Sequence, residues 1–424
     1  MSTVSVEVEV LGGAREVGRA SIALRYKGRV LLLDAGVNFD EEDKPVFART
    51  VPPRDVDGIV LTHAHLDHIG TAPAYYITYQ PPIIATKPTF EMARLMWEDF
   101  LKLNGYYSMY EDAEVKRLME AAVYARYYSP IRVGDEFSVT LYPAGHIPGS
   151  AMVYVEVGGR RILYTGDVNT IYTKLMEPAR VDGMPPVDLM IMEATYGAST
   201  HPPRKIVEER LVAIVEEVVD RGGTVLIPAF SISRGQEVMM ILAERDLGID
   251  VAVDGMVRQV TDIFLENPSY IRNVELLAKA REEFLFVQGW QDRRKVWKRP
   301  GVIIASAGML KGGPSLYYLK KIMGNPKNAV VMVSFQAPGT PGRKILEEGL
   351  FHETGEPIRA RVEWLDLSSH ADRRGLLELV ARIKPAKVLI VHSDGTVADS
   401  FAQLVRDKLG VDVEVAEEGR KYTL

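Results

Sequence analysis

The 424-residue chain is 47% hydrophobic and 25% charged, and its formal net charge is −6. That length predicts two to three domains, and the composition indicates a globular enzyme rather than a disordered chain. Because cysteine is absent, disulfides, iron–sulfur clusters and thiolate zinc sites are excluded, and any metal must be held by His, Asp and Glu. The sequence has no apolar run near the roughly 18 residues of a membrane helix and no signal segment, so we expect a cytoplasmic protein with no membrane contact.

The first part of the chain is expected to form short strands separated by tight turns. β-branched and apolar runs bounded by Gly and Asp occupy 4–10, 21–28, 29–36 and 58–63. A helical stretch is predicted over about 88–127, and strands resume over 138–145, 151–158 and 160–167. Residues capable of chemistry stand where these strands end, on the loops that present side chains to solvent.

The most specific motif is HAHLDH at residues 63–68. His63 and His65 are two residues apart, so in an extended loop they can approach one metal from the same side. Asp67 and His68 follow at once and face a second metal position. The alternative is a solvated polar loop, which requires three of only eight histidines to fall within six residues by chance.

Three further candidate ligands follow other predicted strands: His146 in YPAGHIPGS, Asp167 in LYTGDVN and His392 in VLIVHSDG. The glycines and proline around His146 indicate a fixed turn, and a carboxylate such as Asp167 can bridge two metals. Each of the three, taken alone, is equally compatible with a structural role. Together with the 63–68 motif they supply five imidazoles and two carboxylates, which is enough for two zinc ions (Zn2+) in N/O coordination.

From about Ile206 onward helices and strands alternate, which predicts the α/β class with a parallel sheet. Residues 206–222 have helical spacing and end in Gly, and buried-strand runs follow at 223–230, 250–255, 300–308 and 328–336. A strand is then expected at 360–367, a helix after His370, and a strand and a further helix from 387 onward.

Three Gly/Ser/Thr-rich loops follow strands of this second part, and such loops can hold phosphates through backbone N–H groups and hydroxyls. Ordinary α/β turns are the alternative for any one of them. The residues expected to contact phosphate or RNA are Ser231, Arg234, Ser306, Gly308, Gly339, Thr340, Arg343 and Lys344.

The stretch WQDRRKVWKR at 290–299 interleaves five cations with Trp290 and Trp297, a pattern suited to binding a nucleic-acid strand. A solvated helix face with one core tryptophan explains the pattern equally well. The negative net charge does not exclude nucleic acid, because bound metal ions and a local basic surface outweigh the total.

The metal motifs resemble those of the metallo-β-lactamase superfamily, and this resemblance covers the entire chain. The resemblance implies that His63, His65 and His146 hold one zinc, that Asp67, His68 and His392 hold the other, and that Asp167 bridges them. Asp34 matches an aspartate of the family that supports the ligands from behind, although an acidic turn residue is an alternative.

Three further segments resemble the signature motifs of the β-CASP nucleases: EATYG (193–197), SSHAD (368–372) and VHSDG (391–395). Within that family, the chain looks closest to archaeal homologues of the cleavage and polyadenylation specificity factor nuclease. The resemblance implies an αββα sandwich with an inserted α/β domain whose parallel sheet is flanked by helices. The expected parts are 1–205 and 354–424 for the sandwich and 206–353 for the insertion. The chain opens on its first strand, so the N-terminal KH domains of one archaeal branch are not expected, and VHSDG departs from the family's usual VHGE.

The family resemblance implies a nuclease in which a hydroxide activated by two metals attacks the phosphodiester. His370 would protonate the leaving oxygen, Glu193 would orient His370, and Asp67 completes the expected catalytic set. A histidine at position 392 is typical of the RNA-cleaving members, so single-stranded RNA is the expected substrate. The alternatives are a small-molecule zinc hydrolase acting on a thioester or lactam, a DNA-directed nuclease and an inactive scaffold. The sequence does not decide between endonuclease and 5′-to-3′ exonuclease action, or between a monomer and a homodimer.

Overall fold

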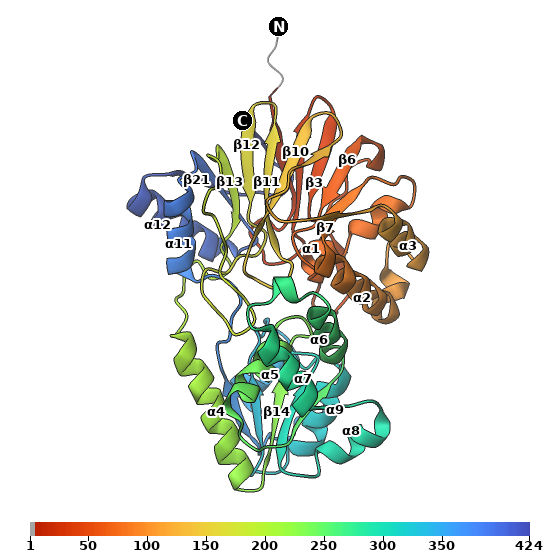
Figure 1. The fold of residues 1–424 in the computed structure, drawn as a ribbon, viewed down its shortest axis with the longest axis vertical. Coiled ribbons are helices and arrows are strands. Elements are labelled where there is room, and N and C mark those ends of the chain that lie inside the picture. The colour runs from red at the N-terminus through yellow and green to blue at the C-terminus, as the bar shows by residue number, and fades with distance from the viewer. Residues whose placement is uncertain (1–4) are drawn as a thin grey trace. The chain divides into compact units, whose positions relative to one another are not determined.

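The computed structural model describes residues 5–424, which form two compact units. Unit 1 comprises the chain up to Ile171, Pro178–Thr200 and His370–Leu424, and unit 2 comprises Tyr172–Glu177 and His201–Ser369. In Figure 1 unit 1 carries the red-to-yellow and dark-blue segments, and unit 2 the green and cyan ones. Val4, the first residue of the strand predicted at 4–10, lies outside the described residues.

Unit 1 contains two seven-stranded sheets. The first has the order β22-β1-β2-β3-β6-β7-β8. Its strands are β1 (Glu7–Gly12), β2 (Ser21–Tyr26), β3 (Arg29–Leu33), β6 (Val56–Val60), β7 (Ile83–Thr86), β8 (Ala122–Ala125) and β22 (Lys421–Thr423). A separate two-stranded sheet joins β4 (Val37–Phe39) to β5 (Pro45–Phe47).

The second sheet has the order β21-β20-β13-β12-β11-β10-β9. Its strands are β9 (Ile131–Val133), β10 (Phe137–Pro143), β11 (Ala151–Val157), β12 (Arg160–Tyr164), β13 (Leu189–Glu193), β20 (Lys387–Val391) and β21 (Asp412–Val415). The strands β12, β13, β20 and β21 run parallel, so the residues that follow β12, β13 and β20 emerge at one edge of the sheet.

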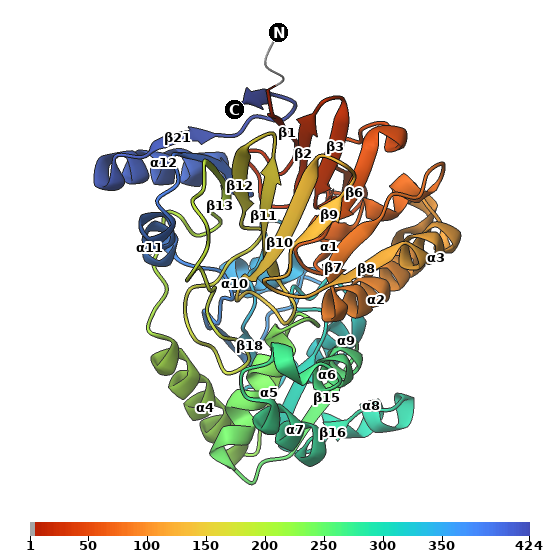
Figure 2. The ribbon, with the colours of Figure 1, turned by 45° about the horizontal axis from the view of Figure 1, so that its top comes forward.

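The two sheets pack face to face around one apolar core that draws on both, for example Val8 and Leu31 from the first and Val139 and Val153 from the second. The outer face of the second sheet packs against α11 (Arg373–Ile383) and α12 (Gly395–Leu409). On the other side lie α1 (Leu66–Ile69), α2 (Lys87–Asn104) and α3 (Asp112–Glu120), as Figures 1 and 2 show. These layers confirm the predicted αββα sandwich.

The helix predicted over about 88–127 is wrong in its extent, because this stretch forms α2, α3 and the strand β8. α2 ends at Gly105, a poor helix former. α3 begins with a capping box in which Glu111 and Glu114 exchange side-chain and backbone hydrogen bonds. The apolar periodicity continues across both helices, so it conceals the break between them.

Unit 2 is built on a six-stranded, wholly parallel sheet of order β16-β15-β17-β14-β18-β19. Its strands are β14 (Thr224–Pro228), β15 (Val251–Asp254), β16 (Leu285–Phe286), β17 (Gly301–Ala305), β18 (Ala329–Met332) and β19 (Arg361–Trp364). The flanking helices are α4 (Arg204–Asp220), α5 (Arg234–Arg245), α6 (Val257–Leu265), α7 (Val274–Glu283), α8 (Trp290–Val296), α9 (Gly313–Ile322) and α10 (Pro341–Glu348). The predicted parallel α/β sheet is confirmed.

The unit boundaries differ from the predicted domain boundaries, chiefly at the second junction. The strand β19 pairs with β18 from Ala329↔Arg361 to Met332↔Trp364, so residues after 353 complete the sheet of unit 2. Unit 2 therefore extends to Ser369 rather than to residue 353. A four-residue edge strand with two charged side chains does not reveal from its sequence which of two sheets it joins.

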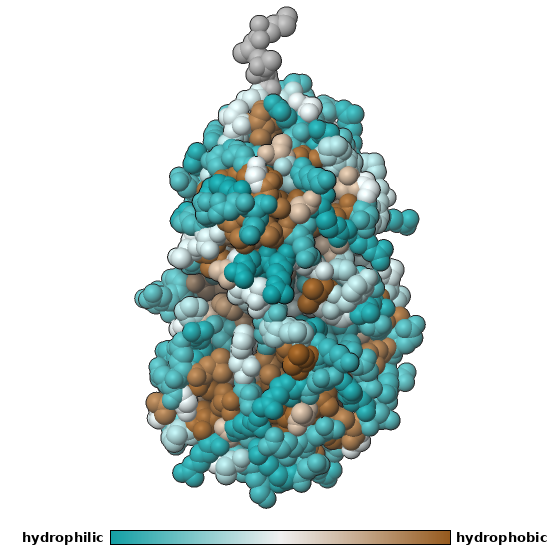
Figure 3. Space-filling model, turned by 90° about the vertical axis from the view of Figure 1, so that its left-hand side faces the viewer, coloured by the Kyte–Doolittle hydropathy of each residue, from teal (hydrophilic) through white to brown (hydrophobic). Residues whose placement is uncertain are grey.

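Within residues 5–424, no helix combines the length and apolarity needed to span a membrane. Figure 3 shows hydrophilic residues across the visible face of each unit, with smaller groups of hydrophobic residues between them.

Candidate metal centre

The predicted motif 63–68 leaves the end of β6 as an extended loop and then turns into the single-turn helix α1. His65 is the N-terminal cap of that helix, and the N–H of His68 donates to its carbonyl. The extended segment brings His63 Nε2 to 3.0 Å from His65 Nδ1. The helical turn carries Asp67 and His68, and the His68 ring lies against that of His63, with centroids 4.1 Å apart. Potential ligand atoms of Asp67 and His68 group with His392 instead of with His65.

His146 stands on a fixed turn after β10. The hydroxyl oxygen of Ser150 accepts hydrogen bonds from the backbone N–H groups of His146 and Ile147, each at 3.2 Å. Gly149 has a φ of +84°, and a Cβ there would lie 2.6 Å from side-chain atoms of Pro88 and Thr86, so only glycine fits. The turn places His146 Nε2 3.2 Å from His65 Nδ1.

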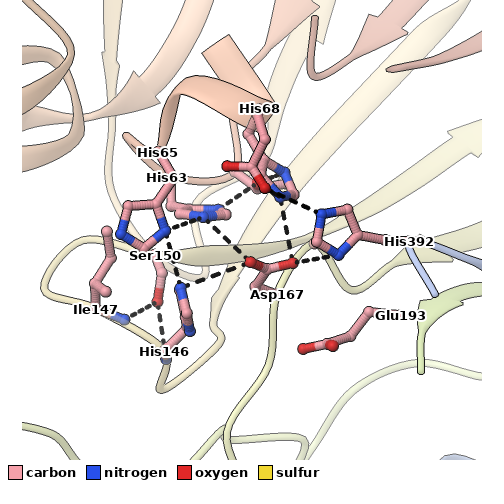
Figure 4. A network of polar contacts seen from close by, with 12 residues as sticks. His63, His65, His68, His146, Ile147, Ser150, Asp167, Glu193 and His392 are labelled. Atoms are coloured by element: carbon pink, nitrogen blue, oxygen red, sulfur yellow. Dashed lines mark hydrogen bonds and ion pairs between the residues drawn. The ribbon is translucent and has the colours of Figure 1, made fainter. Parts of the chain in front are cut away.

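Asp167 lies between two clusters of side chains, as Figure 4 shows. Its Oδ2 is 3.5 Å from His63 Nε2 and 3.6 Å from His146 Nε2. Its Oδ1 is 3.3 Å from His68 Nε2 and 3.4 Å from His392 Nδ1. Each oxygen of this one carboxylate therefore faces a different cluster.

The second cluster consists of Asp67, His68 and His392, and His392 Nε2 lies 3.2 Å from Asp67 Oδ2. His392 follows β20 with a φ of +48°, and its N–H donates to the Gly13 carbonyl. In the VHSDG segment, the Ser393 hydroxyl donates to the Ala194 carbonyl and Asp394 caps α12. These bonds hold the turn formed by the VHSDG segment.

The donor set fits divalent metal ions. Ligand atoms of His63, His65, His146 and Asp167 all lie within 4.8 Å of one another, as do those of the second cluster. Two buried atoms, His68 Nε2 and Asp167 Oδ1, have no hydrogen-bond partner among the described residues, although both point into the cluster. Nitrogens on a tetrahedral zinc ion lie about 3.3 Å apart, close to the separations around His65.

The charge of each histidine depends on how deeply it is buried and on the charged groups around it. Burial, and then the charge of His68, lowers the pKa of His63, and burial lowers the pKa of His65 to about 4. Burial opposes protonation of His68 and His392 as well, but the carboxylates around them, Asp167 foremost, raise the pKa of both. The lowered pKa of His63 and His65 favours the neutral imidazoles that a metal requires, whereas the raised pKa of His68 and His392 favours protonation, which a bound cation opposes.

Asp34 orients His68. Its Oδ2 lies 2.7 Å from His68 Nδ1, which leaves Nε2 directed at the cluster. The carboxylate of Asp34 also accepts hydrogen bonds from the backbone and hydroxyl of Thr62 and from the Tyr164 hydroxyl at 3.0 Å. Sequence reasoning predicted Asp34 but missed Thr62, Tyr164 and Ser150. These three residues have no motif of their own, and Tyr164 lies 130 residues from Asp34, which it supports.

His370 and Glu193 lie together beside the first cluster. His370 Nδ1 is 2.9 Å from Glu193 Oε1, and its Nε2 is 3.9 Å from Asp167 Oδ2. Burial opposes protonation of His370, but the Glu193 and Asp167 carboxylates outweigh it and raise the pKa to about 9. Glu193 also accepts from the backbone N–H of Val168, which ties it to the loop that carries Asp167.

The eight predicted RNA contacts all belong to unit 2 and follow β14, β17 and β18, at one edge of the sheet. Five lie on loops, whereas Arg234 opens α5 and Arg343 and Lys344 lie in the first turn of α10. Arg234, Ser306, Gly308 and Thr340 are buried, and their polar groups have internal roles. For example, Ser306 Oγ accepts from Met256 N–H and Thr340 caps α10. Ser231 is half-buried, Gly339, Arg343 and Lys344 are exposed, and Arg343 pairs with Glu347 at 2.6 Å.

Three family models match the chain. Residues 14–198 match the metallo-beta-lactamase superfamily, residues 236–345 the Beta-Casp domain, and residues 355–416 the Zn-dependent metallo-hydrolase RNA specificity domain.

Several curated proteins are similar over nearly the whole chain. "RNase aCSPSF2" of Saccharolobus solfataricus is 45% identical over 426 residues, covering 100% of this chain and 86% of that protein. "Transcription termination factor FttA" of Methanocaldococcus jannaschii is 35% identical, covering 95% of this chain and 69% of its own. "Probable RNase MJ4" of the same organism is 32% identical, covering 92% and 93% respectively. A crystal structure of a protein of unknown function from Enterococcus faecalis shares the fold, with a TM-score of 0.63 at 13% identity, over 99% of this chain and 100% of that one.

Proposed function

Because the chain belongs to the β-CASP family of the metallo-β-lactamase superfamily, we propose that it is a metal-dependent ribonuclease that hydrolyses phosphodiester bonds of single-stranded RNA. The observation that carries the proposal is the position of Asp167, whose two oxygens each face one cluster of histidines. The relatives named as ribonucleases and the match to an RNA specificity domain support RNA as the substrate.

We propose zinc as the metal, with two ions per chain. His63, His65 and His146 would hold one, Asp67, His68 and His392 would hold the other, and Asp167 would bridge them. Imidazole and carboxylate ligands without a thiolate suit this metal. Two such ions would supply a nucleophile at neutral pH and stabilise negative charge on the phosphate oxygens.

His370 is the proposed proton donor to the leaving 3′ oxygen, which gives a 5′-phosphate and a 3′-hydroxyl as products. Its Nδ1–H is held by Glu193 at 2.9 Å, so the Nε2–H is the proton available for transfer. The Glu193 carboxylate also stabilises the protonated imidazole. Glu193 is thus a positioning residue, whereas His370 touches the reacting atoms.

Unit 2 is proposed to hold the RNA backbone through the exposed members of its loops, Gly339, Arg343 and Lys344, together with Ser231. The buried members, among them Arg234 and Thr340, would shape these loops instead. An RNA substrate made inside the cell agrees with the cytoplasmic location predicted from the sequence. Assembly as a homodimer remains a prediction.

Elemental analysis of the purified protein tests the metal assignment. We expect close to two zinc ions per chain, because seven N/O donors form two clusters around Asp167. His352, an exposed histidine of unit 2, provides the matched control, since His352→Ala should leave the zinc content unchanged. A zinc content of one ion per chain or less, in protein purified without a chelator, would contradict the two-metal proposal.

A further inference from the structure

The helices α8 and α9 carry an aromatic and basic surface that the proposed chemistry does not use. We define this α8–α9 surface by three rings, Trp290, Trp297 and Tyr317, and five cations, Arg294, Lys295, Lys298, Arg299 and Lys321. The helices lie side by side at the periphery of unit 2 in Figures 1 and 2, and Lys321 of α9 lies over the Trp297 ring. The sequence left two interpretations for 290–299, a nucleic-acid surface or a solvated helix face.

The rings are arranged for stacking. Trp290 is 57% exposed, and its ring meets that of Tyr317 edge to face, with centroids 5.5 Å apart at 83°. Trp297 is partly buried against the core of unit 2, so it is the core tryptophan of the second interpretation. Lys298 and Lys321 lie over it at 5.6 and 5.9 Å. Trp297 therefore anchors the C-terminal end of α8, whereas Trp290, with the Arg293 guanidinium 5.0 Å from its ring centroid, remains 57% exposed.

The cations of this surface are uncompensated. Within residues 5–424, no ion pair is formed by Arg294, Lys295, Lys298, Arg299 or Lys321, all of which are exposed. The neighbouring Arg293 and Lys320 differ, because they pair with Asp254 and Glu353. Five free cations on one surface stand out in a chain whose net charge is −6.

The surface is also held rigidly. Arg293 donates two hydrogen bonds to the buried carboxylate of Asp254, at 2.7 and 2.8 Å, and the Tyr318 hydroxyl donates to the same carboxylate at 2.7 Å. This network ties α8 to the end of β15 and to α9. A ring fixed before binding loses little conformational entropy when a base stacks on it.

We propose that the α8–α9 surface is a second binding site for single-stranded RNA, separate from the metal centre, in which a base stacks on Trp290 and the five cations contact phosphates. Exposed aromatic rings interleaved with cations are the features that bind unpaired strands without sequence preference. A membrane surface fits less well, because α8 has seven residues and Val296 is its only aliphatic side chain, too little apolar area to insert. The inference rests on the proposed function, since it assigns RNA as the ligand.

Binding of a fluorescein-labelled, phosphorothioate-substituted RNA, followed by anisotropy at several salt concentrations, tests this site on the full-length metal-loaded protein. Trp290→Ala should raise Kd about tenfold, as expected for one lost stacking contact, and Trp290→Phe should restore most of the affinity. The triple variant Lys295→Glu, Lys298→Glu, Lys321→Glu should reduce the salt slope by about 2, at roughly 0.7 per lost phosphate contact. A triple reversal of exposed lysines elsewhere, at Lys102, Lys327 and Lys408, is the matched control.

Unchanged Kd in both variants, or an equal loss in the control triple, would overturn the site. Loss of binding to anionic phospholipid vesicles in Trp290→Ala, with RNA affinity intact, would also overturn it and assign the surface to membranes. Cleavage of unmodified RNA by the wild type is measured alongside. If the two variants bind RNA more weakly but the wild type does not cleave RNA, the proposed function fails and this site stands. If the wild type cleaves normally and neither variant changes Kd, this site alone fails.

Discussion

Replacement of Asp167 by alanine is expected to lower RNA cleavage by at least about 10³-fold, more than the 10–100-fold typical of losing a residue behind the metal ligands. Its two oxygens face different clusters, at 3.3–3.6 Å from four histidine nitrogens, so its loss removes a ligand from both. We expect zinc content to fall below one ion per chain, measured on the same preparation as the rate.

Asp167→Asn provides the sharper comparison, because the amide keeps the size of the side chain but offers only one oxygen. It should retain about one zinc ion and remain nearly inactive. His352→Ala again serves as the control, because His352 is an exposed histidine of unit 2 outside the proposed ligand set. An Asp167→Asn variant with two zinc ions and normal cleavage would show that no bridging carboxylate is needed.

Replacement of His370 by alanine is expected to lower the cleavage rate by about 10²–10⁴-fold while zinc stays near two ions per chain, as for the loss of a proton donor. Its Nε2 lies 3.9 Å from Asp167 and its Nδ1 is engaged by Glu193. His392→Ala, by contrast, should lose zinc and activity together, because His392 contacts both Asp67 and Asp167.

Glu193→Gln should act in the same direction as His370→Ala, since an amide retains an oxygen for the Val168 N–H but cannot stabilise a protonated imidazole. Loss of zinc from His370→Ala equal to that from His392→Ala would identify His370 as a ligand. Full rate and full zinc in His370→Ala would assign the proton transfer to water.

Much of the site could be predicted from the sequence because its residues stand at or just after the ends of strands, and strand ends are recognisable in a sequence. Asp34 and His392 follow β3 and β20 directly, and His63 and Asp167 stand three residues past the ends of β6 and β12. In the second sheet the parallel strands β12, β13 and β20 bring their ends to one edge. The dense HAHLDH motif marks the end of β6 in the first sheet as the other side of the site. The α/β class and the sandwich follow from the same strand pattern.

The remainder depends on contacts between distant segments, which local patterns do not encode. Tyr164 supports Asp34 across 130 residues, and although it stands in LYTGDVN three residues before Asp167, no local pattern marks its contact with Asp34. The helix predicted over 88–127 contains a break that apolar periodicity conceals. Arg234 and Thr340 occur in loops that resemble phosphate-binding turns, yet both are buried and bonded internally, because burial is decided by packing within unit 2.

Incubation with end-labelled single-stranded RNA and with a DNA of the same sequence, before and after removal of metal, tests whether this chain is a metal-dependent ribonuclease. We predict cleavage of the RNA in preference to the DNA, with 5′-phosphate and 3′-hydroxyl ends, abolished by a chelator and restored by zinc. Equal rates on RNA and DNA, or cleavage that survives complete removal of metal, would contradict the account.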